Sequence, residues 1–207
     1  MVAPTVASFA DLAPTLQGRS IRIEPLRAGH EAGLWAAAGD PRVWRWMPTD
    51  PTASAEEFHG WMADALDRAA AGLDAPFCVL RPDGNEVLGS TRYLALRPEH
   101  RGLEIGWTWL SPAAWGSPAN PEAKLLLMEH AFERLGCMRV EFKTDARNER
   151  SRAALEAIGA RFEGIHRRHM LVQAGDVRDS AWYSVIDEDW PATKAALAAR
   201  VARKEAK

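Results

Sequence analysis

No segment of the sequence constrains the fold more than residues 103–122, where a strand, a short loop and the start of a helix follow one another directly. The strand has a period of two, with the alternating sets Leu103, Ile105, Trp107, Trp109 and Glu104, Gly106, Thr108, Leu110. This pattern predicts that the large apolar side chains share one face and that Glu104 lies on the other. We expect this segment to hold the functional centre of the chain.

The loop after this strand consists of small residues, Trp115 apart, and reads WGSPA over residues 115–119. Asn120 suits the N-cap of the following helix, and Pro121 suits its first turn, where a missing N–H costs nothing. Free backbone N–H groups and the positive end of the helix dipole converge at such a point, which makes it a ready anion site. Ordinary strand-to-helix turns also use small residues, so this feature alone does not identify a function.

The composition describes an ordinary globular protein of 207 residues, 47% hydrophobic and 26% charged, for which one domain is expected. The formal net charge of −2 gives no reason to expect nucleic acid as a partner. Cys78 and Cys137 lie far apart in apolar segments, which predicts buried thiols in a reducing, cytoplasmic setting and no metal site. No apolar run approaches the roughly 20 residues of a spanning helix, and no secretory leader is evident, so no membrane partner is expected.

The pattern along the chain predicts a single domain over residues 19–190 with a short extension at each end. Residues 1–18 carry little pattern and are expected to form a loosely held arm, while residues 191–207 are expected to form a basic helix. Between them the order of elements is β, α, α, β, β, β, α, β, α, β, β. This order predicts one mixed sheet with helices on both faces.

Several ordered motifs match a known family: EIGWTWL from Glu104, WGSPANPEAK from Trp115, TDARNERSRAALEAIGARFEG from Thr144 and RDSAWYSVIDEDWP from Arg178. With these motifs the chain resembles the GNAT-fold N-acetyltransferases, in the branch that contains the RimJ/RimL-type enzymes. The resemblance implies an α/β (α+β) fold with a single mixed, mostly antiparallel sheet that is splayed at its centre. It also implies that acetyl-coenzyme A is the donor and lies between the strand ending at Leu110 and the strand 138–144.

The resemblance also implies where this donor would bind. The expected contacts are Trp109, Leu110, Ser111, Trp115, Gly116, Ser117, Pro118, Ala119, Asn120, Asn148 and Ser151. The family loop has the form Gln/Arg-x-x-Gly-x-Gly/Ala, whereas this chain has Trp115 first, Pro118 at the middle glycine and Asn120 last. Because proline has no N–H, this phosphate cradle has one donor fewer than the family pattern.

Acetyl transfer to an amine needs a base for the amine, a donor for the developing oxyanion and a proton for the leaving thiolate. Glu104 is the candidate base, and its alternative role is that of a solvated glutamate on a strand surface. Asn148 and Ser151 have the spacing of an N-cap pair, which explains them without catalysis. By the resemblance, Asn148 also contacts the pantetheine arm and Ser151 protonates the thiolate, for which Tyr183 is a weaker candidate.

An aromatic cluster lies in the first third of the chain. Trp44, Trp46, Met47 and Trp61 are candidates for the acceptor pocket, because in this fold the first two helices cover the acceptor side. An acceptor pocket lined by these residues would suit an amine with an apolar body. Packing in the core is the alternative role for each of the four.

The sequence therefore predicts an N-acetyltransferase that transfers acetyl to a primary amine by direct attack, without a covalent enzyme intermediate. The acceptor is either a protein or peptide N-terminus or a small-molecule amine. The alternative from another class is a catalytically inactive coenzyme A-binding sensor or structural protein, which the proline in the loop keeps open. Family members often dimerise, so a homodimer is also open.

Overall fold

The computed structural model describes residues 9–84 and 86–206, and in this part of the chain eight strands form one sheet in the order β1-β2-β3-β4-β5-β6-β8-β7. The strands are β1 Leu16–Gln17, β2 Arg22–Pro25, β3 Ala75–Leu80, β4 Val87–Arg97, β5 Gly102–Leu110, β6 Arg139–Asp145, β7 Arg161–Leu171 and β8 Val177–Ile186. The helices are α1 Glu31–Ala38, α2 Ala55–Ala70, α3 Ala119–Glu129, α4 Glu149–Glu156 and α5 Trp190–Glu205, and a π-helical turn, His130–Arg134, extends α3. The mixed, mostly antiparallel sheet confirms the predicted fold class.

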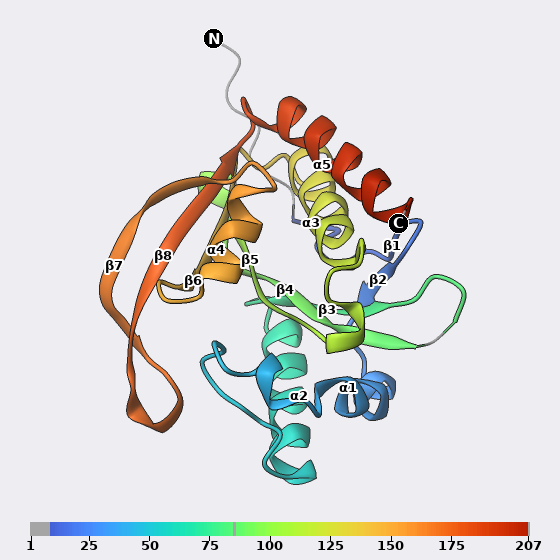
Figure 1. Cartoon of the computed structure of the whole chain (residues 1–207), viewed down its shortest axis with the longest axis vertical. Coiled ribbons are helices and arrows are strands. Elements are labelled where there is room, and N and C mark those ends of the chain that lie inside the picture. Colours follow the sequence, from blue (N-terminus) through green and yellow to red (C-terminus); the bar gives the residue numbers. More distant parts are fainter. Residues whose placement is uncertain (1–8, 85, 207) are drawn as a thin grey trace.

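Two hydrophobic cores occupy the two faces of the sheet (Figure 1). On one face, α1 and α2 bury residues such as Leu34, Phe58 and Met62. On the other face, α3, α4 and α5 bury residues that include Leu127, Leu155 and Leu197. These helices carry apolar residues on the side that meets the sheet, so burial of that side stabilises both layers at once.

The sheet opens at its centre, between β5 and β6. These two strands are parallel and pair only from Gly102 to Glu104 on β5, against Arg139 to Glu141 on β6. Beyond that point β6 continues to pair with β8, and β5 continues to pair with β4. The two halves of the sheet therefore diverge beyond Glu104, and the gap between them passes from one face of the sheet to the other.

A β-bulge interrupts β5 inside this gap. Trp107 and Thr108 together lie opposite the single residue Thr91, and Trp107 has a left-handed φ of 49°. The extra residue reverses the alternation beyond it. Thr108 consequently faces α3, where its Oγ1 accepts a hydrogen bond of 2.8 Å from Lys124.

The bulge overturns the predicted division of the strand into two faces. Leu103 and Ile105 pack into the core beneath α3, as the alternation predicts, but Trp109 packs into the core beneath α1 and α2. Trp107 also lies on that second side, beneath the guanidinium of Arg92. The prediction of one shared apolar face is therefore wrong, and Glu104 shares its face with both tryptophans.

The N-terminal arm is more firmly attached than the sequence suggested, although residues 1–8 of it lie outside the described part of the chain. Phe9, Leu12 and Leu16 pack against the larger core, and β1 pairs with β2. The buried carboxylate of Glu122 on α3 then accepts the backbone N–H groups of residues 19 and 20 at 2.8 and 2.9 Å. These contacts correct the expectation of a loose arm for residues 9–18.

Candidate active site

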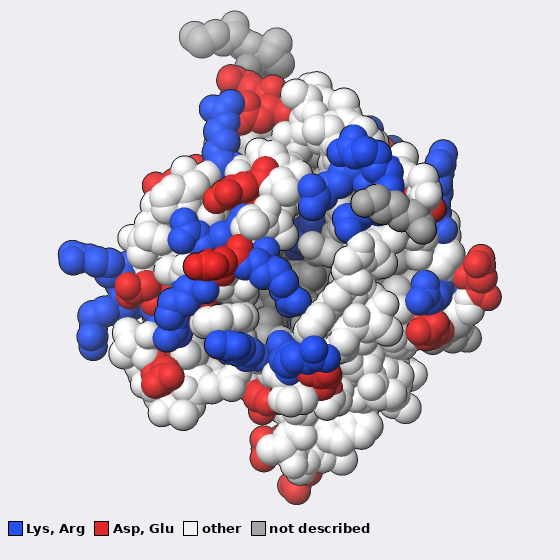
Figure 2. Space-filling model, in the orientation of Figure 1, with Lys and Arg blue, Asp and Glu red and all other residues white. Residues whose placement is uncertain are grey.

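A cleft of about 420 Å³ lies where β5 and β6 separate. One side of it, here called the α3 half, is lined by Leu110, Trp115, Asn120, Lys124, Phe142, Asn148 and Ser151. The other side, here called the hairpin half, is lined by Trp46, Met47, Glu104, Trp107, Lys143, Met170 and Arg178. Figure 2 shows lysine and arginine side chains around a hollow in this face of the molecule. A cleft that crosses the sheet can receive two reactants from opposite sides.

Glu104 lies at the junction of the two halves. Its side chain comes from the last β5 residue that pairs with β6, and only 1% of the residue is exposed. Burial raises the pKa of this carboxyl, and Lys143, whose Nζ donates a hydrogen bond to Oε2 at 2.9 Å, opposes part of that rise. A Cβ atom at Gly106 would lie 2.7 Å from Oε1, so glycine there leaves room for the carboxylate. A carboxylate with a raised pKa is suited to accept a proton near neutral pH.

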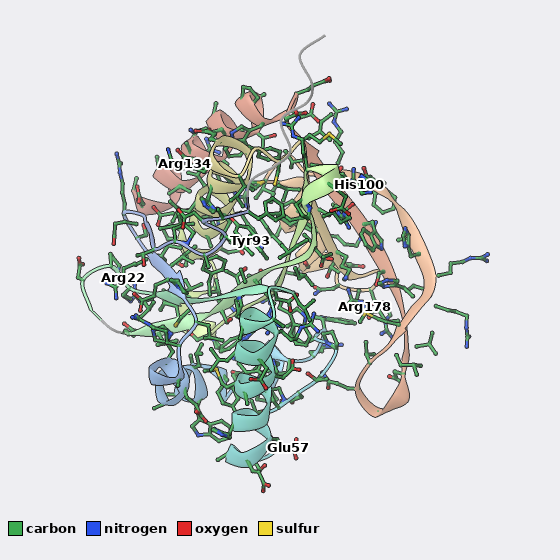
Figure 3. The ribbon with its side chains drawn as sticks, turned by 180° about the vertical axis from the view of Figure 1, so that it is seen from behind. Arg22, Glu57, Tyr93, His100, Arg134 and Arg178 are labelled. Atoms are coloured by element: carbon green, nitrogen blue, oxygen red, sulfur yellow. The ribbon has the colours of Figure 1, made fainter. Side chains whose placement is uncertain are left out.

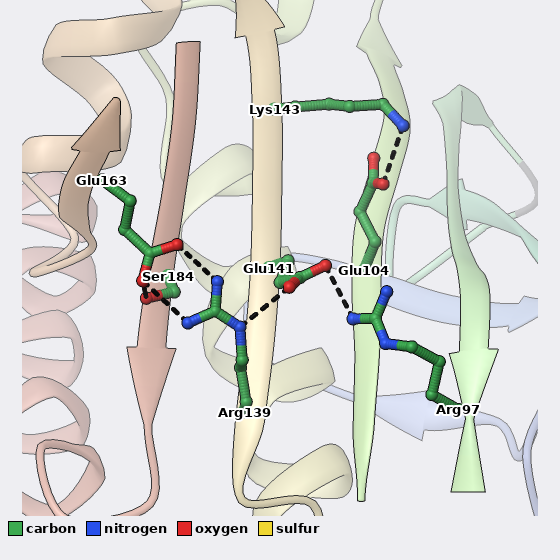
Figure 4. A network of polar contacts seen from close by, with 7 residues as sticks. All are labelled: Arg97, Glu104, Arg139, Glu141, Lys143, Glu163 and Ser184. Atoms are coloured by element: carbon green, nitrogen blue, oxygen red, sulfur yellow. Dashed lines mark hydrogen bonds and ion pairs between the residues drawn. The ribbon is translucent and has the colours of Figure 1, made fainter. Parts of the chain in front are cut away.

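A network of ion pairs fixes the strand next to Glu104 (Figure 4). Glu141, the β6 residue paired with Glu104, accepts hydrogen bonds from Arg97 at 2.7 Å and from Arg139 at 2.8 Å. Arg139 in turn contacts Glu163. Two guanidinium groups thus compensate the charge of Glu141, and its remaining negative field is one of the smaller influences that raise the pKa of Glu104.

Lys124 is a functional candidate that the sequence analysis missed. It is 5% exposed, its Nζ donates to Thr108, and the ammonium lies 5.5 Å from the centre of the Phe142 ring. Burial lowers the pKa of Lys124 to about 7, although Glu104 acts in the opposite direction. A signal was present in the sequence, because Lys124 falls on the same helical stripe as the buried residue Met128.

The loop before α3 differs in two details from the prediction. The helix begins at Ala119 with Pro118 as its N-cap, so Asn120 does not cap it. The hydroxyl of Ser117 donates to the carbonyl of Ala114 at 2.6 Å and accepts the N–H of Ala119 at 3.1 Å. One of the amides expected to bind phosphate therefore already has a partner inside the loop.

The predicted donor-binding residues fall into two groups. Those that line the cleft are Trp109, Leu110, Trp115, Gly116, Asn120, Asn148 and Ser151. Four neighbouring loop residues do not line it, namely Ser111, Ser117, Pro118 and Ala119. The cleft therefore meets this loop at Gly116 and Asn120, on either side of the proline.

Trp115 holds two guanidinium groups at the mouth of the α3 half. Its Nε1 donates to the carbonyl of Leu110 at 2.8 Å, which fixes the ring. The guanidinium of Arg150 lies 4.3 Å from the ring centre, and that of Arg42 lies 5.2 Å away. Arg42 is paired with Asp40, whereas Arg150 forms no ion pair with the residues that the structure describes. An arginine in this position is of a type that suits phosphate groups.

The start of α4 brings Asn148 and Ser151 to the cleft. The side-chain oxygen of Asn148 accepts the backbone N–H of Ser151 at 3.1 Å, as the capping pattern predicts. The hydroxyl of Ser151 takes no part in this bond. Tyr183 is fully buried, and its hydroxyl accepts a hydrogen bond from Arg152 and donates one to Glu156, each of 3.1 Å. Tyr183 does not line the cleft, whereas Ser151 does.

Of the four residues predicted to line the acceptor pocket, two line the cleft and two do not. Trp46 and Met47 line the hairpin half. Trp44 is fully buried and donates from Nε1 to the carbonyl of Ala38, and Trp61 packs against it at 6.0 Å between ring centres. Neither Trp44 nor Trp61 lines the cleft. Trp44 has the core role that was its alternative, and the half-buried Trp61 packs against that core and lines a second pocket with Trp107.

The tip of the β7–β8 hairpin covers this half. The side-chain amide of Gln173, between β7 and β8, donates to the carbonyls of Trp44 and Met47 at 2.8 and 2.9 Å. Figure 1 shows the hairpin as a long arm whose tip reaches the level of the α1–α2 layer. The arm and residues 44–48 therefore border the hairpin half on two sides.

The two cysteines take no part in the cleft. Cys78 and Cys137 are buried free thiols, as predicted, and burial raises the pKa of each to about 12. Neither lines the cleft, so neither is placed to act as a covalent acyl carrier. Among residues 9–84 and 86–206 there is no cluster of three metal-ligating side chains. Across the same residues, no helix combines the length and the apolar character needed to cross a bilayer.

Comparison with known proteins gives the family. The model of the acetyltransferase (GNAT) domain matches residues 20–161. The chain belongs to the GNAT acetyltransferase family. Its fold is similar to that of a GCN5-related N-acetyltransferase from Brucella melitensis, with 35% identity, a TM-score of 0.84 and coverage of 90% of this chain and 85% of that one.

The chain is also similar to one further relative in sequence and to one further structure in fold. An uncharacterized N-acetyltransferase of Bacillus subtilis, YoaA, is 30% identical over 51% of this chain, and the match spans 59% of YoaA. RimJ of Mycobacterium smegmatis, solved in complex with CoA-disulfide, has the same fold with a TM-score of 0.76 at 22% identity, covering 91% of this chain and 93% of RimJ. The protein is an acyltransferase of the GNAT type, with neighbours in the RimJ/RimL branch that the sequence motifs indicated.

Proposed function

We propose that this protein transfers an acetyl group from acetyl-coenzyme A to a primary amine by direct attack in a ternary complex. The observation that carries the proposal is the cleft that crosses the sheet, with Glu104 where its two halves meet. Members of this family use acetyl-coenzyme A, and a neighbour of the same fold was solved with a coenzyme A derivative.

The α3 half suits acetyl-coenzyme A on several counts. It runs from Gly116 and Asn120, at the N-terminus of α3, to Phe142 and Ser151. The helix end and Arg150 supply positive charge for phosphates. The side-chain NH₂ of Asn148 remains available for a pantetheine carbonyl, because only its oxygen is used for capping. These residues would hold the donor with its thioester near Glu104.

Glu104 and Ser151 would handle the protons. Glu104 takes a proton from the substrate ammonium, directly or through a water, which leaves the amine free to attack the thioester carbon. A C–N bond forms and the C–S bond breaks. Ser151 gives its hydroxyl proton to the thiolate sulfur. The attacking nitrogen loses its second proton as the amide forms, and that proton returns to Ser151 through water, while Glu104 releases its own proton to solvent. A main-chain N–H of the bulged strand near Leu110 would stabilise the oxyanion.

A coenzyme A-binding sensor without turnover is the second candidate. It is favoured by the loop before α3, in which Pro118 has no N–H and the amide of Ala119 is bonded to Ser117. Such a sensor would bind acetyl-coenzyme A weakly and release no thiol. The position of Glu104 favours the enzyme, because its carboxylate lies where the two halves of the cleft meet and burial raises its pKa, as suits a general base.

The test is release of free coenzyme A from acetyl-coenzyme A over a panel of small amines and peptides. We expect release that depends on both the protein and one class of amine, together with an acetylated product of mass +42 Da. Binding of acetyl-coenzyme A without release on any amine would replace the enzyme with the sensor.

A further inference from the structure

Arg178 is a buried guanidinium without a counter-ion. It belongs to β8, it is 4% exposed, and its side chain lines the hairpin half of the cleft. Its Nε donates to Ser180 at 3.0 Å, and no carboxylate in the described residues forms an ion pair with it. Figure 3 shows Arg178 on the inner side of the β7–β8 arm. Burial lowers the pKa of this guanidinium. Burying a cation without a paired counter-charge is costly, and an anionic ligand on Arg178 would offset that cost.

The neighbouring acids are already engaged elsewhere. Asp145 accepts two side-chain hydrogen bonds from Arg147, at 2.9 and 2.8 Å. Glu104 accepts the ammonium of Lys143. Both acids oppose the fall in the Arg178 pKa, which means that they lie within electrostatic reach without bonding to it. The two terminal nitrogens of Arg178 remain available for an anion.

The size and polarity of the hairpin half limit what this anion can belong to. Trp46 and Met47 form an apolar wall, and Met170 lines the cavity from β7. Gln173 ties the hairpin tip to the carbonyls of residues 44 and 47. A pocket with an apolar wall on one side and a buried cation on the other suits a small molecule that has an apolar body and an anionic group.

We propose that the acceptor is a small primary amine that carries a carboxylate, of the kind of an apolar α-amino acid, and that Arg178 binds this carboxylate through its two terminal nitrogens. This inference rests on the proposed acetyl transfer and names its acceptor class. With the carboxylate on Arg178 and the apolar body against Trp46 and Met47, the amine lies toward Glu104. A peptide N-terminus lacks this carboxylate, because its first carboxyl group is an amide.

The experiment compares acids with their amides as acceptors. The pairs are L-phenylalanine with L-phenylalaninamide and L-methionine with L-methioninamide, and a hexapeptide that begins with methionine serves as the polypeptide acceptor. Thiol release is measured with the full-length protein and acetyl-coenzyme A. We expect kcat/KM to be at least roughly tenfold higher for one or both acids than for the matching amide, in line with a charge-assisted pair. The α-amino group of the amino-acid amide has a lower pKa than that of the free acid, so more of it is unprotonated at neutral pH. Intrinsic reactivity would therefore favour the amide, and it cannot explain a preference for the acid.

Three variants separate recognition from structure. Arg178→Gln should raise the KM for the acid by roughly tenfold or more and leave the amide unchanged. Arg178→Lys keeps the positive charge but cannot form the two parallel hydrogen bonds of a guanidinium. Its KM for the acid should lie between that of the native protein and that of Arg178→Gln. Arg167→Gln is the matched control, because Arg167 is an exposed arginine on β7 of the same hairpin. This variant should leave the KM for the acid and the KM for the amide unchanged. Because Arg178→Gln removes an unpaired buried charge, its melting temperature should not fall.

The outcomes distinguish the two proposals. Equal or better turnover of the amides or of the hexapeptide would overturn the carboxylate-bearing acceptor and leave acetyl transfer intact. An equal loss on acid and amide in Arg178→Gln would also overturn it. If no acceptor releases thiol, acetyl transfer itself fails. The anion site is then judged by binding of N-acetyl-L-phenylalanine in the presence of coenzyme A. A thermal shift that is absent for its methyl ester and lost in Arg178→Gln supports the site, and the lack of such a shift overturns it.

Discussion

Replacement of the buried Lys124 by methionine should stabilise the protein at acidic and neutral pH. The pKa of Lys124 is lowered from 10.5 to about 7, mainly by burial. At about 1.4 kcal/mol for each tenfold change, this corresponds to about 5 kcal/mol as an upper limit on the cost of burying the ammonium. Methionine loses the hydrogen bond to Thr108, which contributes about 1 kcal/mol. We therefore expect a net gain of at most about 4 kcal/mol at pH 6.

The sign of the pH dependence follows from proton binding. Between about pH 7 and pH 10.5 the unfolded chain keeps the Lys124 proton that the folded protein has lost. Unfolding therefore binds a proton in this range, and the stability of the native protein rises with pH. The advantage of Lys124→Met should accordingly be largest below pH 7 and should shrink toward pH 10.

Urea unfolding at pH 6 and pH 9.5 measures this difference. Lys194→Met is the matched control, because the pKa of Lys194 on α5 is raised, chiefly by its hydrogen bond to Glu133, so its replacement should give no gain at pH 6. A Lys124→Met protein that is less stable than the native one at pH 6, or that shows the same pH dependence, would refute the argument that burial of the ammonium is costly.

Three further substitutions probe the cleft. Ser151→Ala should lower kcat by roughly 100-fold with little change in the affinity for acetyl-coenzyme A, because the helix cap uses the backbone N–H of Ser151 and is kept. An equal loss of kcat and of affinity would indicate a structural role for Ser151. Gly106→Ala should lower kcat by roughly tenfold or more, as the new methyl group displaces the Glu104 carboxylate; steady-state kinetics with unchanged turnover would contradict this. Pro118→Gly should tighten acetyl-coenzyme A binding by roughly tenfold in calorimetry, since it restores one N–H, and an unchanged Kd would mean that the loop amides do not bind phosphate.

Much of the fold could be predicted from the sequence, because the order of elements and the family motifs extend over most of the chain. The bulge in β5 could not. An alternation of apolar and polar residues fixes the faces of a strand only while the period stays at two, and Trp107 suits either face. One extra residue moved Trp109 to the opposite core from Ile105.

The candidate site was predicted unevenly for similar reasons. Glu104, Asn148 and Ser151 all line the cleft, since motifs fix their positions on the elements that border it. Trp44 and Trp46 are chemically identical and two residues apart, so composition could not say which one packs in the core. The environment of Arg178 depends on carboxylates that bind other cations, and such a tertiary feature leaves no mark in the local sequence.

In the proposed reaction, Glu104 removes the proton from the amine that attacks the thioester of acetyl-coenzyme A. The most direct test is the pH dependence of kcat/KM for thiol release by the native protein and by Glu104→Gln. We expect a fall of roughly 100-fold or more at pH 7 for Glu104→Gln, with partial recovery at higher pH, where more of the amine is already deprotonated. The pKa of Glu104 is raised by burial, so the acidic limb of the native profile should lie above the ordinary pKa of a glutamate. Equal turnover by the two proteins at every pH would contradict the claim.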